Sequence, residues 1–474
     1  MTAMTRVTIP ATAPDQGDGR KVVSALCFSV MTLAILQAAV VPVVPTMARQ
    51  LAVGPTAVGW VVTANLLAAA VVTPVLSRLA DQRGCRPVLI GMLIAVVIGS
   101  VLCVLSPSLP LLIIGRVMQG AGFALFPIGV AVVRAVLDER RVTRAIGLMS
   151  GIMAAGGGLG IVAAGVLVVD GGDYRRVFWM LLVLSLVALI VVWWAIPDTR
   201  RRDTHGRRFD AAGTVLIAVA LCALLLAIAE GSRWGTWVIL PLGIGSCGCF
   251  CWWYRYEKRC ADPLIPPRAL IDRAVTPVHI AAVLVGAAMY VQFLGIAQFV
   301  QIDAGLGGYG FGYTVLEASL MFLLPGSVVG VVTATLSGRL ISRFRADLVL
   351  ASMCGVGLVG FTLLGFTHDQ PWQIVVAAGV INVFVSGAYT ALPSLLIEAV
   401  PAGDTAVVNG VNAIARVVGS SLASAVVASL LAVMTLEGSD VPSESAFTLS
   451  FVLGGAAAAG AGVCGLLAHT RAEG

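Results

Sequence analysis

Charged side chains are scarce in this chain. Aspartate, glutamate, lysine and arginine make up 11% of its 474 residues, while 59% of the residues are hydrophobic. Soluble domains carry about 25% charged residues and about 45–50% apolar ones. A soluble fold could not hide this much apolar surface. Lipid must therefore cover much of the chain, and a water-soluble globular protein is excluded.

Lysine is nearly absent as well. Only Lys21 and Lys258 accompany the arginines that give the chain its net charge of +6. A basic balance can indicate nucleic-acid binding. Here, however, most of the basic residues stand in short loops between apolar runs, a placement that orients membrane proteins. We therefore expect a lipid bilayer as partner and no nucleic acid.

Nucleotide and metal motifs are missing too. The chain has no Gly-x-x-x-x-Gly-Lys segment, so we expect no ATP drive. Cys247, Cys249 and Cys251 suggest a metal site, but a spacing of two points successive residues to different faces of a helix, and no histidine lies nearby. The four histidines are scattered: His205, His279, His368 and His469. We expect no metal and no other cofactor, and a membrane enzyme or sensor is the least favoured function.

Long apolar runs are what the chain has in abundance. A helix needs about 20 apolar residues to span the bilayer. Fourteen runs approach or exceed this length: 22–45, 57–76, 87–105, 109–134, 144–169, 177–196, 211–229, 236–254, 276–302, 314–341, 346–366, 372–398, 404–434 and 446–468. The pattern predicts an all-α integral membrane protein with six spans, a pair, and six more spans.

The basic residues divide and orient these spans. With the N-terminus in the cytosol, four of them fall outside (Arg49, Arg175, Arg176 and Arg233), two fall inside spans (Arg116 and Arg416), and the rest lie at cytosolic ends or in the tails. We therefore predict a protein of the cell inner (plasma) membrane with both termini cytosolic. Its parts would be a disordered tail (1–21), a six-helix bundle (22–196), basic linkers with two extra helices (197–273), a second six-helix bundle (274–468) and a tail (469–474).

A short internal repeat supports two related halves. Ser77-Arg-Leu-Ala-Asp81-Gln-Arg83-Gly84 follows the second span of the first half, and Gly338-Arg-Leu-Ile-Ser342-Arg343-Phe-Arg345 follows the second span of the second half. Each copy is a small residue, then Arg-Leu, then a polar basic turn. Internal repeats of this kind are typical of secondary transporters.

The first copy resembles a known family motif. Leu79-Ala-Asp81-Gln-Arg83-Gly84-Cys-Arg86-Pro87 is similar to the loop between spans two and three of the major facilitator superfamily, in particular its fourteen-span drug:proton antiporter branch. The resemblance implies two six-helix bundles with two extra central helices, and a network of Asp81, Arg83 and Arg86 that latches the halves in one state. The alternative is ordinary surface pairing, worth about 0–1 kcal/mol.

Two buried arginines carry further resemblance. Gly115-Arg116-Val-Met-Gln119-Gly120-Ala-Gly122 is similar to the family's Arg-centred motif in span four, where the arginine helps proton coupling. Asn409 to Gly419, around Arg416, is similar to the span-eleven pattern of the same branch. An arginine at membrane depth costs about 2.5–3.5 kcal/mol or more. Arg116 must therefore snorkel to the surface or, with Gln119 three residues on, line a polar cavity.

Glycines and aromatics add two more matches. The pairs Gly147/Gly151 and Gly156/Gly160 in span five would let another helix approach closely. This stretch is similar to the branch's antiporter motif, although Gly157 stands where the family usually has proline. Tyr174-Arg175-Arg176-Val-Phe178-Trp179 is similar to the Trp-Arg-x-x-Phe entry to span six, and the residues alone favour an interfacial anchor there.

The usual span-one aspartate of this branch is missing. Gln37 stands at the loosely aligned position, and the predicted spans carry no carboxylate near their middle. A proton antiporter needs a group that titrates on the transport path. Glu317 is the first candidate for this coupling role. The alternative for Glu317 is a solvated carboxylate in a first helical turn.

Polar residues within the spans are the candidates for a substrate cavity: Gln37, Asn65, Gln119, Gln292, Gln298, Asn382, Tyr389 and Asn412. The sequence therefore predicts a monomeric secondary transporter with a midplane site for a small molecule. The resemblance favours export of hydrophobic or cationic molecules by proton antiport. A metabolite importer or facilitator without proton coupling is the alternative, because the span-one aspartate is missing.

Overall fold

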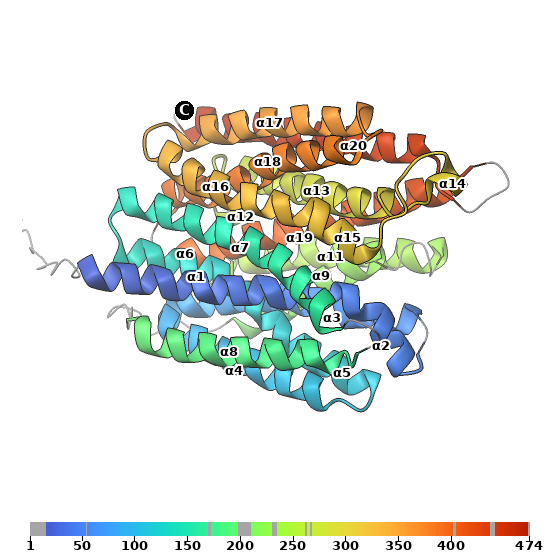
Figure 1. Cartoon of the computed structure of the whole chain (residues 1–474). Coiled ribbons are helices and arrows are strands. Elements are labelled where there is room, and N and C mark those ends of the chain that lie inside the picture. Colours follow the sequence, from blue (N-terminus) through green and yellow to red (C-terminus); the bar gives the residue numbers. More distant parts are fainter. Residues whose placement is uncertain are drawn as a thin grey trace, which may run out of the picture.

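A computed structural model describes residues 16–53, 55–168, 172–197, 210–229, 235–260, 263–265, 268–401, 404–436 and 441–472. Within these ranges the regular structure is helical, apart from one isolated bridge between Thr435 and Pro442. The long helices run side by side in one bundle (Figure 1). The protein is therefore all-α, as the apolar runs predict.

The first half of the bundle, here the N half, consists of α1 (Gln16–Ala38), η1 (Val41–Val43), α2 (Val44–Gln50), α3 (Pro55–Arg83), α4 (Cys85–Leu105), α5 (Leu109–Gln119), η2 (Gly120–Ala124), α6 (Leu125–Val136), α7 (Glu139–Leu167) and α8 (Arg175–Ala195). The extra pair follows: α9 (Ala211–Ala229) and α11 (Thr236–Glu257).

The second half, here the C half, consists of α12 (Arg268–Ile271), α13 (Thr276–Phe299), α14 (Ala304–Gly307), α15 (Val315–Ala318), the π-helical turn η4 (Ser319–Leu323), α16 (Leu324–Ile341), α17 (Ala346–Phe366), α18 (Pro371–Ala399), α19 (Thr405–Val433) and α20 (Glu444–Ala472). In the described chain, thirteen helical stretches are long and apolar enough to cross a membrane, and Ala212–Ile228 is a shorter apolar helix. They follow the fourteen predicted runs one for one.

Two hydrophobic cores lie along the chain. One is built from residues between Val22 and Ile196, together with Ala406. The other is built from residues between Ile217 and Ala468, so it includes the inner faces of the extra pair. Many large apolar side chains outside these cores are exposed, such as Trp194, Trp237 and Val433. In a bundle of this composition, that exposed surface is the one lipid covers.

The two ends of the bundle differ in charge. The turns after α3, α6, α16 and α18 gather at one end with the start of α1 and the end of α20, on the left of Figure 1. These turns and their flanks carry Arg83, Arg86, Arg141, Arg343 and Arg345, and we call this the basic end. The other end, with α2 and α14, is called the opposite end.

The halves meet along two matching seams. In each half, the second long helix packs against the fifth long helix of the other half: α3 against α19, and α16 against α7. At the second seam, a Cβ on Gly147 would lie 2.4 Å from the carbonyl oxygen of Ala334, and one on Gly151 would lie 3.0 Å from the Val331 backbone. Only glycine permits backbones to approach this closely.

The extra pair lies beside the first seam. Ser246 of α11 donates a hydrogen bond to the Ala220 carbonyl of α9 at 2.8 Å, and Tyr256 donates to the Asp210 carboxylate at 3.0 Å. α9 also packs against α3 and α19. Much of α11 faces outward, including Ile244, Cys247 and Trp252. The pair therefore extends the bundle without separating its halves.

Candidate functional site: an inter-half latch and two buried arginines

Asp81 bridges the two halves at the basic end. It lies in the last turn of α3, and its carboxylate accepts hydrogen bonds from the backbone amides of Ala406 (3.3 Å) and Val407 (2.9 Å). These amides belong to the first turn of α19, where a helix has unpaired N–H groups and the positive end of its dipole. The carboxylate thus caps a helix of the other half, and its partner is a helix terminus rather than a basic side chain.

Two arginines of the N half strengthen this junction. Arg78 of α3 is buried and pairs with Asp404, the residue before α19, at 3.3 Å. Arg134, near the end of α6, donates to the hydroxyl of Thr405 and to the carbonyl oxygens of Ile397 (2.9 Å) and Val400 (3.2 Å). Arg134 therefore holds the end of α18 and the start of α19 together against the N half.

The other predicted latch residues lie elsewhere. Arg83 is the last residue of α3, and it is exposed. Arg86 donates to the carbonyl oxygen of Trp193 at 2.7 Å, which ties α4 to α8 within the N half. The contacts between the halves at the basic end are made by Arg78, Asp81 and Arg134 on one side and by Ile397, Val400 and residues 404–407 on the other. We use the word latch for these residues below.

Arg116 forms the centre of a closed polar network inside the N half. Its side chain is 1% exposed. The guanidinium donates to the Val61 carbonyl oxygen from Nε (3.1 Å) and to Gln119 Oε1 from Nη1 (2.8 Å). Gln119 in turn donates to Ser100 at 2.9 Å. Arg116 thus stays inside the bundle instead of reaching for the membrane surface, and both of these partners are neutral.

Asn65 completes the same network from α3. Its amide donates to the carbonyl oxygen of Arg116 at 2.8 Å. The same carbonyl oxygen also accepts from the Gly120 amide, where α5 gives way to the 3₁₀ turn η2. A Cβ at Gly120 would lie 2.8 Å from the Asn65 carbonyl. The sequence predicted Asn65 and Gln119 as cavity residues and Arg116 as a coupling residue. The structure brings the three side chains together in one cluster, and their roles in transport stay predictions.

Arg416 forms a second cluster in the C half. Its guanidinium donates to the side-chain oxygen of Asn412 one turn earlier and lies 4.5 Å from the ring centroid of Tyr389 on α18. Tyr389 donates to the sulfur of Met289 on α13 at 3.3 Å. Across the seam, Ser150 of α7 donates to the Tyr389 carbonyl oxygen at 3.2 Å. Tyr389 therefore links Arg416 to both halves.

The remaining predicted cavity residues divide into two groups. Gln292 (3.2 Å) and Asn382 (2.9 Å) both donate to the carbonyl oxygen of Ala378, so α13 and α18 are joined there. Gln37 and Gln298 are half-buried and belong to neither arginine cluster. Whether any of these side chains contacts substrate stays a prediction.

The second glycine pair of α7 serves the N half alone. A Cβ on Gly156 would lie 2.8 Å from the Met31 carbonyl, and one on Gly160 would lie 2.8 Å from the Ile35 carbonyl, both on α1. Gly147 and Gly151, by contrast, face the other half. One helix thus uses one end of its glycine stretch for the inter-half seam and the other end for its own bundle.

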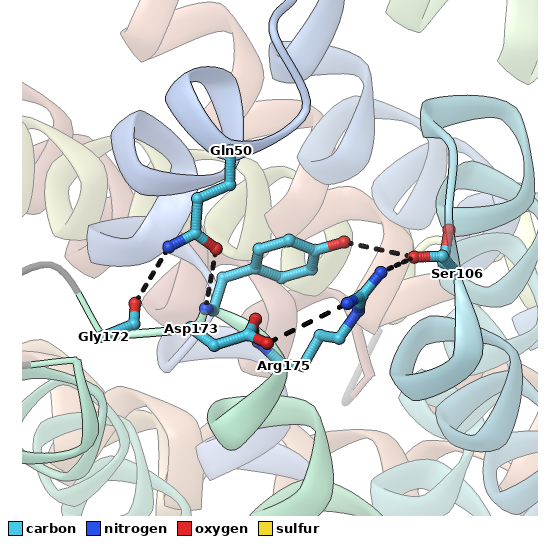
Figure 2. A network of polar contacts seen from close by, with 6 residues as sticks. Gln50, Ser106, Gly172, Asp173 and Arg175 are labelled. Atoms are coloured by element: carbon cyan, nitrogen blue, oxygen red, sulfur yellow. Dashed lines mark hydrogen bonds and ion pairs between the residues drawn. The ribbon is translucent and has the colours of Figure 1, made fainter.

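The Trp-Arg-x-x-Phe-like segment joins three loops at the opposite end (Figure 2). Arg175 donates to the Ser106 carbonyl oxygen at 2.6 Å and pairs with Asp173 at 3.9 Å. Gln50 donates to the Gly172 carbonyl at 3.1 Å and accepts from the Tyr174 amide at 3.2 Å. The segment fastens α2 and the α4–α5 turn to the start of α8, which is a structural task.

Glu317 has the geometry of a helix cap. Its carboxylate accepts from the backbone amide (2.9 Å) and the hydroxyl (2.8 Å) of Thr314, and the Thr314 hydroxyl accepts from the Glu317 amide, which is a capping box. The bonds from Thr314 lower the pKa of this exposed carboxyl. A lowered pKa keeps Glu317 ionised at neutral pH, and any stability the cap gives is lost only as the pH falls through that value. Its role in proton coupling stays a prediction.

Glu317→Gln separates the two interpretations. Glutamine can fill the same capping box. If Glu317 only caps, the variant transports as wild type does under an imposed pH gradient. If Glu317 carries the proton, pH-driven transport is lost while substrate binding persists. From the geometry we expect the first result, and a loss of pH-driven transport with intact binding would contradict it.

The described residues hold no group of three or more histidine, cysteine or acidic side chains placed to bind a metal ion. The arginine clusters and the seams described above consist of hydrogen bonds, buried charges and closely packed helices. These are the means by which a bundle changes state without making or breaking covalent bonds.

Known proteins that resemble this chain in fold are membrane transporters. The fold is similar to that of the human organic anion transporter TETRAN (TM-score 0.65, 12% identity, 96% of this chain and 99% of that one). It is also similar to that of FucP in the outward conformation (TM-score 0.64, 13% identity, 95% and 98%). At these identities the likeness concerns the fold.

Sequence comparison extends the match to the family. The chain is 30% identical over 398 residues to the multidrug resistance protein Stp of Mycobacterium tuberculosis (82% of this chain, 71% of Stp). It is 27% identical over 399 residues to the uridine/deoxyuridine transporter of Lactococcus lactis (80% and 82%). The family model of the Major Facilitator Superfamily matches residues 26–424. The chain therefore belongs to the Major Facilitator Superfamily, and it is a multi-pass membrane transporter rather than an enzyme.

Proposed function

We propose that this transporter exports hydrophobic or cationic small molecules by proton antiport, with the two halves rocking around a midplane site. The observation that carries the proposal is the latch. The side chains of Arg78, Asp81 and Arg134 all fasten the halves at the basic end. Closure at one end fits a rocking mechanism, because the site must be closed on one side while it opens on the other.

The charge of the basic end indicates which side of the membrane the latch closes. Basic loops mark the cytosolic side of membrane proteins. With the basic end in the cytosol, the latched conformation is closed toward the cytosol. We therefore expect a reporter that works only in the cytosol to be active when it is fused to Gly474. Activity of a reporter that works only in the periplasm would place the basic end outside instead.

Aromatic side chains near the seam favour an apolar cargo. Tyr290 and Phe293 of α13 are half-buried, with ring centroids 6.3 Å apart, and Tyr389 lies on the neighbouring α18. Aromatic faces bind flat apolar groups and cations. The relative named as a multidrug resistance protein fits this chemistry.

A facilitator or importer of a metabolite is the second candidate. It is favoured by Gln37, an amide that cannot titrate, at the position where the resembling branch carries a carboxylate. The relative named as a uridine/deoxyuridine transporter shows that similar chains can carry a nucleoside. Both candidates share the fold and the latch and differ in the energy source.

Transport by purified protein in liposomes decides between them. We expect an imposed pH gradient, acid on the side of the opposite end, to drive accumulation of at least one apolar cation from a small panel of dyes and drugs. Empty liposomes and a proton uncoupler are the controls. If uridine or another compound of the panel is transported at a rate that does not depend on the pH gradient, the result favours the facilitator and contradicts proton antiport.

A further inference from the structure

His368 has acceptor oxygens on both of its ring nitrogens. It lies in the turn between α17 and α18 at the opposite end and is 8% exposed. Its Nδ1 lies 2.9 Å from the carbonyl oxygen of Leu364, and its Nε2 lies 2.8 Å from Oε1 of Glu444, the first residue of α20. The imidazole thus bridges its own helix end and the start of another helix.

These contacts require one proton more than a neutral histidine and a carboxylate possess. A neutral imidazole has a single N–H, and the other nitrogen offers a lone pair. The Leu364 carbonyl can only accept, and an ionised Glu444 can only accept. Both contacts are hydrogen bonds only if the imidazole is doubly protonated or if Glu444 carries a proton. In either case the pair holds an extra proton.

Water can exchange protons with this pair, and the neighbouring titratable side chain stays neutral. The Glu444 side chain is 52% exposed, so water reaches the pair from its side. The Phe299 ring, at the end of α13, lies 5.0 Å from the imidazole centroid and shields it from the bundle interior. Among the described groups, Tyr309 of the α13–α15 loop also faces this site. Burial raises the pKa of Tyr309 to about 12, and its hydroxyl donates to the Pro442 carbonyl, so it stays neutral.

We propose that His368 and Glu444 form a proton-binding site at the opposite end of the bundle. The bound proton fastens the α17–α18 turn to α20. Its loss places a lone pair of the imidazole against the Leu364 carbonyl or the Glu444 carboxylate, and one of the two contacts breaks. The Phe299 ring then loses its packing partner at the end of α13, the helix that carries Met289 and Gln292.

Nitrogen-15 labelling of histidine tests the site directly. The chain has four histidines, so a labelled sample in lipid nanodiscs gives few imidazole signals, and His368→Asn identifies those of His368. At about pH 7.5, where an imidazole without a proton-sharing partner has a single N–H, we expect both His368 nitrogens to appear as N–H. In Glu444→Gln the neutral amide cannot balance an imidazolium, and we expect one nitrogen to lose its proton at the same pH.

Asp369→Asn is the matched control, since Asp369 is the exposed acid next to His368 in the chain. It should leave both nitrogens as N–H. A single N–H on wild-type His368 together with an ionised Glu444 carboxylate, seen in the carbon-13 signal of labelled glutamate, would overturn the proposal. Glu444→Gln spectra identical to wild type would overturn it as well. A changed His368 pattern in Glu444→Gln is not a sign of misfolding if the signals of His279, which is buried in α13, are unchanged in the same sample.

A transport measurement tests whether proton binding at His368 and Glu444 affects the transport cycle. This experiment, unlike the nitrogen-15 one, rests on the proposed function. Glu444→Gln should shift the dependence of transport on the pH outside the liposome, with little change when the pH inside is varied. If transport proves independent of pH altogether, the proposed antiport fails while the nitrogen-15 result still decides the proton site.

Discussion

Replacing Arg116 with alanine is expected to reduce transport to roughly a tenth or less, while the protein still reaches the membrane. The change removes the donors to the Val61 carbonyl and to Gln119 Oε1, and both acceptors lie inside the N half. Each buried group left unpaired costs about 1–3 kcal/mol, and a loss of about 1.4 kcal/mol at a rate-limiting step is already tenfold in rate.

Conservative variants separate the charge of Arg116 from its hydrogen bonds. Lysine keeps the charge but offers a compact ammonium in place of the planar fork that reaches both partners. Glutamine keeps a donor without the charge. If the charge takes part in coupling, Arg116→Lys retains a larger share of pH-driven transport than Arg116→Gln. If only the hydrogen bonds matter, the two variants lose similar shares.

Arg176→Ala is the control, since Arg176 is an exposed arginine at the start of α8. It should transport normally. Uptake is measured per amount of monodisperse protein, so that poor folding is not counted as poor transport. Normal transport by Arg116→Ala at normal protein levels would show that the network around Arg116 is dispensable.

The parts of this structure that the sequence predicted are those set by local composition. Hydropathy located the fourteen helices because the bilayer imposes a minimum apolar length. Helix ends were harder: the predicted run 57–76 became Pro55–Arg83, since Arg78 and Asp81 continue the helix beyond the apolar stretch. For Arg116 the sequence left two possibilities, snorkelling to the surface or lining a polar cavity, and a spacing of three residues placed Gln119 on the same face of the helix.

The inter-half contacts could not be derived from local pattern. Asp81 and Val407 lie 326 positions apart, and the partner of Asp81 is a backbone amide that every residue type supplies. Arg134 looked like one of many basic residues at a span end, although it binds three groups of the C half. His368 looked like one of four scattered histidines, because its partner Glu444 follows 76 positions later. Such sites arise only once the helices are arranged in space.

Asp81→Asn is expected to release the latch, and with it the conformation described here. An amide keeps one acceptor oxygen but loses the charge that the first turn of α19 stabilises. Hydrogen bonds to a charged group contribute about 1.5–3 kcal/mol. Loss of that amount would lower the population of the latched state roughly 10- to 150-fold relative to its alternative. We expect transport to fall sharply, because a cycle that rarely closes at the basic end rarely completes.

Hydrogen exchange gives a readout at the site itself. The amides of Ala406 and Val407 are donors to Asp81, so their exchange, followed by mass spectrometry on peptides from residues 404–410, should accelerate in Asp81→Asn. Asp138→Asn is the matched control. Asp138 precedes α7 at the same end, its side chain is 88% exposed, and it is only loosely paired with Arg141 at 3.9 Å. This control should leave exchange in that peptide unchanged.

The combination of Asp81→Asn with Arg134→Ala tests whether the latch acts as a unit. Both side chains hold the α18–α19 junction, from α3 and from α6. If they stabilise the same closed state, the double variant exchanges little faster than the more severe single variant, because either loss already opens the junction. Additive effects would mean two independent contacts. Unchanged exchange and unchanged transport in Asp81→Asn would show that the carboxylate caps α19 without holding the halves together.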